Sequence, residues 1–238
     1  MGNLRNAINS YTQYLQLSSE IHDLSSELKA LNFLGVDHYL LAKQAVENNA
    51  DGDLVSKHLN TAVSFHRRHF ELTDEAGKFV ANNNIGICYE LMGDITEAAK
   101  YHQNALRLAI KMKSLHGQSV SVGNLGLLAM KKGDFATAKS CFEQHLNLTQ
   151  TLEDASAEIN AWKLVRDYVE YIIIVKSLQT AELYFKESNL ESAIENIEQA
   201  RQVALRSSLF NELRVLNCLL GEIRSNAGFG SFVEKLII

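Results

Sequence analysis

The chain has 238 residues, 46% of them hydrophobic, and a formal net charge of −5. Such a composition supports a sizeable folded core and excludes the disordered class. The acidic balance leaves no basic footprint for nucleic acid or an anionic membrane, so we expect neither partner.

Proline is absent and only 13 glycines are present, while strand-like alternation is missing, which predicts an all-helical protein. Three cysteines without a CxxC pair support neither a disulfide framework nor a zinc site. We therefore expect a reducing, cytoplasmic location. Residues 1–17 do not resemble a signal peptide, and the longest strongly apolar run, residues 171–175, is too short to span a bilayer.

The first predicted element is a helix over residues 3–18, with Asn3 as its N-cap. It is followed by a helix around Gly35, a loop at residues 48–53, and a helix around Ala62. The distance from Gly35 to Ala62 is longer than in the next two hairpins by fifteen residues, about four helical turns. We therefore expect a longer first helix that breaks at this loop.

The two central hairpins repeat one pattern forty residues apart, since residues 84–108 and 124–148 share the order Asn, Gly, Gly-Asp and Ala. Gly93 and Gly133 are suited to end one helix in a left-handed conformation, and Asp94 and Asp134 to cap the next. The mid-helix glycines, Gly86 and Gly126, predict close helix crossings, with Ala98 and Ala138 as the facing small residues.

Downstream, no helix breaker interrupts residues 167–188, which predicts one helix of about thirty residues. Asn189 is suited to cap the helix that contains Ala193, and Gly221 marks another first helix. Residues 230–238 are expected to begin a second helix.

The pattern resembles the tetratricopeptide repeat, with Tyr89, Ala98, Ala138, Phe142 and Trp162 at positions typical of that family. The forty-residue period is similar to that of the Pins-type (Leu-Gly-Asn repeat) adaptors. The resemblance implies one domain over residues 1–238. That domain would be a right-handed α-solenoid with about four full helix-turn-helix repeats and a half repeat at each end.

The resemblance also implies a non-catalytic adaptor or scaffold that binds a peptide or helix of another protein in its concave groove. Asn84 and Asn124 are the leading candidates, because repeated amides at one repeat's spacing can bind the backbone of an extended peptide. A second interpretation is that these amides only satisfy hydrogen-bonding groups in the backbone of a neighbouring helix. The full set of expected partner-binding residues is Asn32, Asn83, Asn84, Ile87, Asn124, Leu127, Met130, Lys131, Lys163 and Asp167.

Two other functions stay open: a structural subunit of a ciliary or cytoskeletal assembly, and a peptide-sensing regulator. Apolar repeat faces at both ends would allow self-association. We expect no enzyme activity and no cofactor, because nucleophile elbows, phosphate loops and HExxH motifs are absent from the sequence. His66 and His69 could share a metal only with further ligands, so we expect no metal site.

Overall fold

The computed structural model describes residues 2–207, 209 and 213–225, and all of its regular structure is helical. The all-helical prediction is therefore confirmed for the described chain. The helices are α1 (Gly2–Glu20), α2 (Leu24–Glu47), α3 (Gly52–Leu72), α4 (Glu75–Met92), α5 (Ile95–Lys111), α6 (Leu115–Lys132), α7 (Phe135–Thr151), α8 (Ala155–Lys186) and α9 (Leu190–Arg206). Residues 213–225 form a further helical stretch, called segment 213–225 below.

The chain divides into two compact units, Met1–Ala161 and Trp162–Ile238. Each unit has a core of its own. Small residues such as Ala30, Ala62 and Ala98 are fully buried in the first, and Ile174, Ile197 and Leu216 form a cluster in the second. The expectation of one domain over residues 1–238 stays a prediction. The half repeat expected at residues 230–238 lies outside the described residues.

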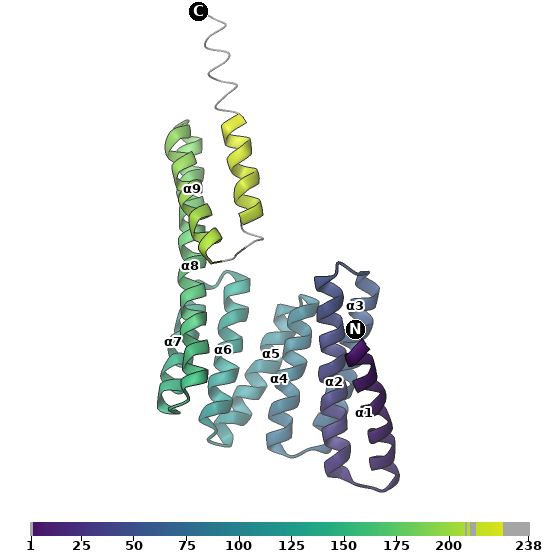
Figure 1. Cartoon of the computed structure of the whole chain (residues 1–238). Helices are drawn as coiled ribbons and strands as arrows, with labels where there is room; N and C mark the ends of the chain where they lie inside the picture. Colours follow the sequence, from purple (N-terminus) through teal and green to yellow (C-terminus); the bar gives the residue numbers. More distant parts are fainter. Residues whose placement is uncertain (1, 208, 210–212, 226–238) are drawn as a thin grey trace, which may run out of the picture. The chain divides into compact units, whose positions relative to one another are not determined.

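In the first unit, each helix packs against the next one in the chain, from α1 to α7. The first helices of the hairpins, α2, α4 and α6, also contact one another in sequence. They form a row (Figure 1). Helix α1 packs on α2 in the position that the second helix of a preceding hairpin would take. This arrangement is the stacked helical-repeat fold that the sequence pattern predicted.

The tight turns have the local chemistry that the sequence indicated. Gly93 and Gly133 have φ angles of 83° and 79°, so each ends its helix in the left-handed region. The Asp94 and Asp134 side chains accept hydrogen bonds from the backbone N–H groups of Glu97 and Thr137. Asn189 caps α9 in the same way, but Asn3 does not cap α1, because that helix already begins at Gly2.

The close crossings occur at the predicted glycines, but the prediction of the residue that faces each glycine was wrong. A Cβ atom on Gly86 would lie 2.7 Å from the His102 ring, and one on Gly126 would lie 2.7 Å from the Phe142 ring. The crossing glycine therefore receives a ring from the residue one helical turn after the repeat alanine, rather than facing Ala98 or Ala138. Gly35 and His66 repeat the arrangement in the preceding hairpin.

The helices are longer in the two regions where the sequence predicted this. In the first, α2 has 24 residues and α3 has 21, compared with 18 and 17 in the α4–α5 hairpin. In the second, α8 is one continuous helix of 32 residues, as the missing breaker predicted. Within the described part of the chain, none of the helices has the length and apolar character needed to cross a membrane.

Candidate protein-binding groove

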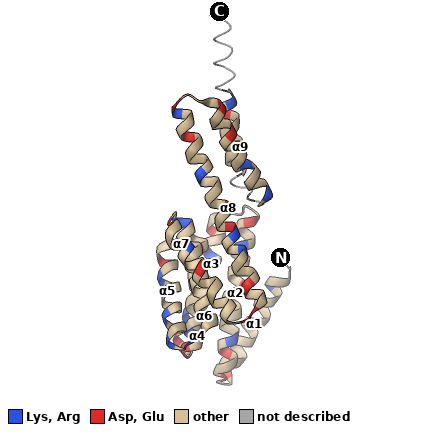
Figure 2. Ribbon diagram, turned by 90° about the vertical axis from the view of Figure 1, so that its left-hand side faces the viewer, with Lys and Arg blue, Asp and Glu red and all other residues tan. Residues whose placement is uncertain are grey.

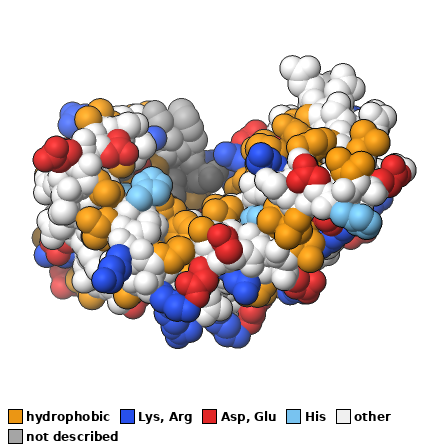
Figure 3. Space-filling model, turned by 90° about the horizontal axis from the view of Figure 1, so that it is seen from below, with side chains coloured by type: hydrophobic (Ala, Val, Ile, Leu, Met, Phe, Trp, Pro, Cys, Tyr) orange, Lys and Arg blue, Asp and Glu red, His pale blue; other side chains and the backbone are white. Residues whose placement is uncertain are grey.

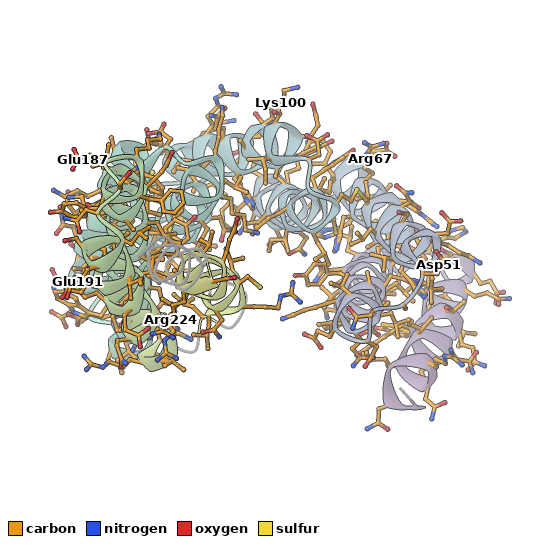
Figure 4. All side chains as sticks on the ribbon, turned by 90° about the horizontal axis from the view of Figure 1, so that it is seen from above. Asp51, Arg67, Lys100, Glu187, Glu191 and Arg224 are labelled. Carbon is orange, nitrogen blue, oxygen red and sulfur yellow. The ribbon has the colours of Figure 1, made fainter. Side chains whose placement is uncertain are left out.

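The inner row of helices in the first unit provides the candidate groove. The helices of this unit follow an arc in Figure 4, with Arg67 of α3 and Lys100 of α5 on its outer side. The direct contacts of α2 with α4 and of α4 with α6 agree with this curvature, since helices approach one another on the inside of a curved stack. The inner surface therefore consists of α2, α4 and α6.

The candidate asparagines pair with one another across this row. Asn84 Nδ2 of α4 donates to Asn32 Oδ1 of α2 at 3.0 Å, and Asn124 Nδ2 of α6 donates to Asn83 Oδ1 of α4 at 3.1 Å. Asn32, Asn84 and Asn124 are half-buried, whereas Asn83 is buried. The amides thus link consecutive repeats by side-chain bonds, which neither of the two sequence interpretations had specified.

Asn83 has a second partner in His102, whose Nδ1 lies 3.0 Å from Asn83 Oδ1. Because the amide oxygen can only accept, His102 Nδ1 must donate, which leaves Nε2 as an acceptor. Nε2 is buried without a partner among the described residues. Burial lowers the pKa of His102 to about 4, so the ring is neutral and serves as a packing group beside Gly86.

A small pocket opens between α2 and α4 beside the Asn32–Asn84 pair. It has a volume of about 220 Å³ and is lined by Val36, Tyr39, Leu40, His66, Asn84 and Ile87. Aliphatic and aromatic walls with one amide are typical of a subsite that holds a single side chain of a bound peptide. Asn84 donates through Nδ2 to Asn32, which leaves its Oδ1 available as an acceptor.

Charged groups continue the inner surface from α4 to α6. Lys131 Nζ of α6 lies 2.6 Å from Glu90 Oε1 of α4, and Lys131 is half exposed. Burial and the nearby Glu90 carboxylate raise the pKa of Tyr39, so its phenol is a hydrogen-bond donor at neutral pH. Lys and Arg are interspersed with Asp and Glu on the helices of this unit (Figure 2).

The structure places the other expected residues in two groups. Leu127 and Met130 are half-buried on α6, the helix that carries Asn124 and Lys131. Lys163 and Asp167 belong to the second unit, where Asp167 accepts a 2.9 Å hydrogen bond from Arg166. The structure therefore brings Asn32, Asn84 and Ile87 to one small area, and Asn83 and Asn124 to the neighbouring helix contact.

Sequence reasoning missed the α2 wall of the pocket, which Val36, Tyr39 and Leu40 form. These residues follow Gly35, which aligns with Gly86, and Tyr39 lies four residues after Gly35 as Glu90 lies four after Gly86. That register could have found Tyr39. His66 is only 1% exposed because it packs against Gly35, and its ring also forms part of the pocket.

Two further histidines lie close together at the other side of α2. His38 Nδ1 and His58 Nδ1 are 3.1 Å apart, and burial lowers the pKa of both rings. One neutral ring can donate to the other, so the hydrogen bond accounts for the short distance. In the described residues, no group of three or more His, Cys, Asp or Glu side chains is placed to hold a metal ion.

The comparisons with known proteins agree with this architecture. Residues 78–151, which contain α4 to α7 except for the first three residues of α4, match the model of the tetratricopeptide repeat family. The described chain therefore has a helical-repeat fold, and residues 78–151 are similar to tetratricopeptide repeats. A search of curated proteins found no match for the sequence.

Two crystal structures have a similar fold over nearly the whole chain. BtubC (BKLC) from P. vanneervenii aligns with 94% of this chain and 92% of its own, with a TM-score of 0.52 and 12% identity. A Rap protein in complex with competence and sporulation factor aligns with 94% of this chain and 59% of its own, with a TM-score of 0.51 and 14% identity. At these identities the likeness establishes the fold alone.

Proposed function

We propose that this protein is a non-catalytic interaction module that binds a segment of a partner protein along α2, α4 and α6. The pocket beside the Asn32–Asn84 pair is the observation that carries the proposal. It combines an apolar wall with an amide acceptor, Asn84 Oδ1, to which no described residue is seen to donate. An aliphatic side chain of the partner fits its volume of about 220 Å³, and the adjacent amide is suited to a peptide N–H group. Leu127, Met130 and Lys131 would extend contact along α6.

The test compares proteins retained by the purified wild-type chain and by a pocket variant, Leu40→Glu. Leu40 is 36% exposed and lines the pocket, so the carboxylate should block an apolar anchor without unfolding the helix. Ile110→Glu is the matched control, because Ile110 is 56% exposed on α5 outside the pocket. We expect quantitative mass spectrometry to show specific partners lost only with Leu40→Glu.

Retention of the same partners by Leu40→Glu would refute the groove proposal, provided that circular dichroism shows unchanged helicity. A second pocket variant, Ile87→Glu, distinguishes an ineffective Leu40→Glu substitution from a binding site that was assigned to the wrong place. Asn84→Ala combined with Asn124→Ala tests the amides themselves. If this double variant loses binding and the two pocket variants do not, the hydrogen bonds between repeats set the shape of the groove.

The resemblance to Pins-type adaptors stays a prediction. So does the cytoplasmic location, with an association with the cytoskeleton or a cilium. A peptide-sensing regulator would use the same inner face but would also change its curvature on binding. Small-angle scattering with and without an identified partner peptide distinguishes it from a rigid adaptor. Light scattering at increasing concentration tests the structural-subunit alternative, which requires association through the ends of the stack.

A further inference from the structure

The second unit contains a larger apolar pocket that the groove on α2, α4 and α6 does not involve. It has a volume of about 450 Å³ and lies between α8, α9 and segment 213–225. Ile197 of α9 contributes to it from the buried core of the unit. Its apolar walls include Val175, Leu178, Ala181, Phe185, Leu219 and Ile223.

The pocket is elongated along α8. Its lining positions on this helix run from Val175 to Phe185 at helical spacing. Ten residues of α-helix correspond to about 15 Å, or nearly three turns. An apolar groove of this length suits the anchor residues of a bound helix at positions i, i+3 or i+4, and i+7.

Apolar side chains of α8 are also exposed. Phe185, which lines the pocket, is 41% exposed, and Ile173 and Leu183 of the same helix are exposed by 43% and 61%. An exposed phenylalanine side chain at an apolar pocket is typical of a binding surface.

The charged residues in the pocket lining are both acidic, Glu182 of α8 and Glu222 of segment 213–225. Glu182 lies 2.7 Å from Lys186, but both side chains are about two-thirds exposed, so this ion pair is weak and can exchange partners. Among the described residues that line the pocket, none is a lysine or an arginine. The pocket therefore favours a ligand with cationic groups beside its apolar anchors.

We propose that this pocket binds an amphipathic helix of a partner protein, with leucine-like anchors on one face and lysine or arginine beside them. The anchors would occupy the apolar groove along α8, and the cations would pair with Glu182 and Glu222. The site lies entirely within the second unit. A test of this site is therefore independent of a test of the groove proposed in the first unit.

The probe is a fluorescein-labelled model helix of about 14 leucine and lysine residues, which is four turns long. It is titrated with the full chain by fluorescence anisotropy, beside a matched peptide in which glutamate replaces lysine. We expect the leucine–lysine peptide to bind and the leucine–glutamate peptide to bind at least about tenfold more weakly. Equal binding of both peptides would overturn the proposed charge selectivity.

Two variants of the protein locate the binding. Gln179→Trp places a large ring in the pocket from an exposed position, and Glu182→Lys with Glu222→Lys reverses its charge. Each should weaken binding of the leucine–lysine peptide at least about tenfold. The matched control, Glu187→Lys with Glu191→Lys, makes the same change in net charge at two exposed residues that project from the outer edge of this unit in Figure 4.

The control should bind within about twofold of the wild-type chain. An equal loss of binding in the control would attribute the effect to net charge and overturn the proposal. So would the absence of binding by the wild-type chain. A wild-type dimer in light scattering that Gln179→Trp converts to a monomer would assign the pocket to a second copy instead. Circular dichroism of every variant confirms that helicity is retained.

Discussion

Individual glycines matter in this protein because rings from the next helix lie against them. The His66, His102 and Phe142 rings lie within 3 Å of where a Cβ atom would stand on Gly35, Gly86 and Gly126. The residue that fills the crossing changes from histidine to phenylalanine along the stack, so its chemical requirement is a flat ring. Hydrogen bonding is additional, as with Asn83 and His102.

Gly86→Ala should therefore destabilise the protein despite the better helix propensity of alanine. The added Cβ would lie 2.7 Å from the His102 ring, and such overpacking costs about 1–3 kcal/mol. Gly52→Ala is the matched control on α3, because no atom lies within 4 Å of its added Cβ. We expect urea unfolding to show a lower midpoint for Gly86→Ala and an unchanged or higher midpoint for Gly52→Ala. The reverse order would contradict the close crossing.

The buried histidines should make stability depend on pH. Burial lowers the pKa of His66 and His102 to about 4, whereas an unfolded histidine has a pKa of about 6.5. As the pH falls through the range between these values, the unfolded chain takes up protons that the native chain does not. The free energy of unfolding should fall by about 1–2 kcal/mol per histidine between pH 7 and pH 5.

His102→Phe tests this linkage, since Phe142 already occupies the equivalent position in the next repeat. The variant loses the bond to Asn83 and should be less stable at pH 7. Its decrease in the free energy of unfolding from pH 7 to pH 5 should nevertheless be smaller than that of the wild-type chain. An undiminished decrease, measured by urea unfolding at both pH values, would show that His102 is not the group that titrates.

At the scale of the helix, the turns depend on chemistry that is local in the sequence. Gly93 is followed directly by Asp94, whose side chain accepts a hydrogen bond from the backbone N–H group three residues later. The whole turn, with its helix end and its N-cap, therefore lies within five residues. This is why the sequence predicted these turns correctly. The ring against Gly86 comes from another helix, and periodicity identified the glycine without identifying what packs on it.

Replacing a cap should destabilise one helix end by a modest amount. Asp134→Ala removes the acceptor for the Thr137 N–H group and should lower the free energy of unfolding by about 1 kcal/mol. Lys139→Ala on the same helix α7 is the control, because its ion pair with Glu143 is long and exposed and contributes little. Thermal unfolding that shows equal effects for the two variants would contradict the role of the cap.

The candidate site was harder to predict than the turns, because it depends on how unequal repeats stack. Asn124 lies forty-one residues after its partner Asn83, close to the repeat period. Asn84 lies fifty-two residues after its partner Asn32, because the α2–α3 hairpin is longer. Leu40 was missed for the same reason, since its neighbours on α4 follow only from the three-dimensional stack, whereas Tyr39 could have been found from its position four residues after Gly35.

At the scale of the whole first unit, stability should behave as a chain of neighbouring contacts. Each helix from α1 to α7 packs on the next, and the inner row adds contacts of α2 with α4 and of α4 with α6. Figure 3 shows hydrophobic side chains at the surface in separate patches among charged groups. In such a stack, stability is a sum of repeat and interface contributions, so damage to one repeat is transmitted mainly to its neighbours.

Gly126→Ala provides a test, because the added Cβ would lie 2.7 Å from the Phe142 ring and 3.0 Å from Cys141 Cβ. Native-state hydrogen exchange measured by mass spectrometry should show faster exchange in α6 and α7, a smaller increase in α5, and little change in α1 and α2. Gly35→Ala, which would place a Cβ 2.5 Å from the His66 ring, should give the mirror-image pattern with its maximum in α2 and α3. A uniform increase over α1 to α7 in both variants would mean that the unit opens as one cooperative body, because only global unfolding exposes distant helices equally.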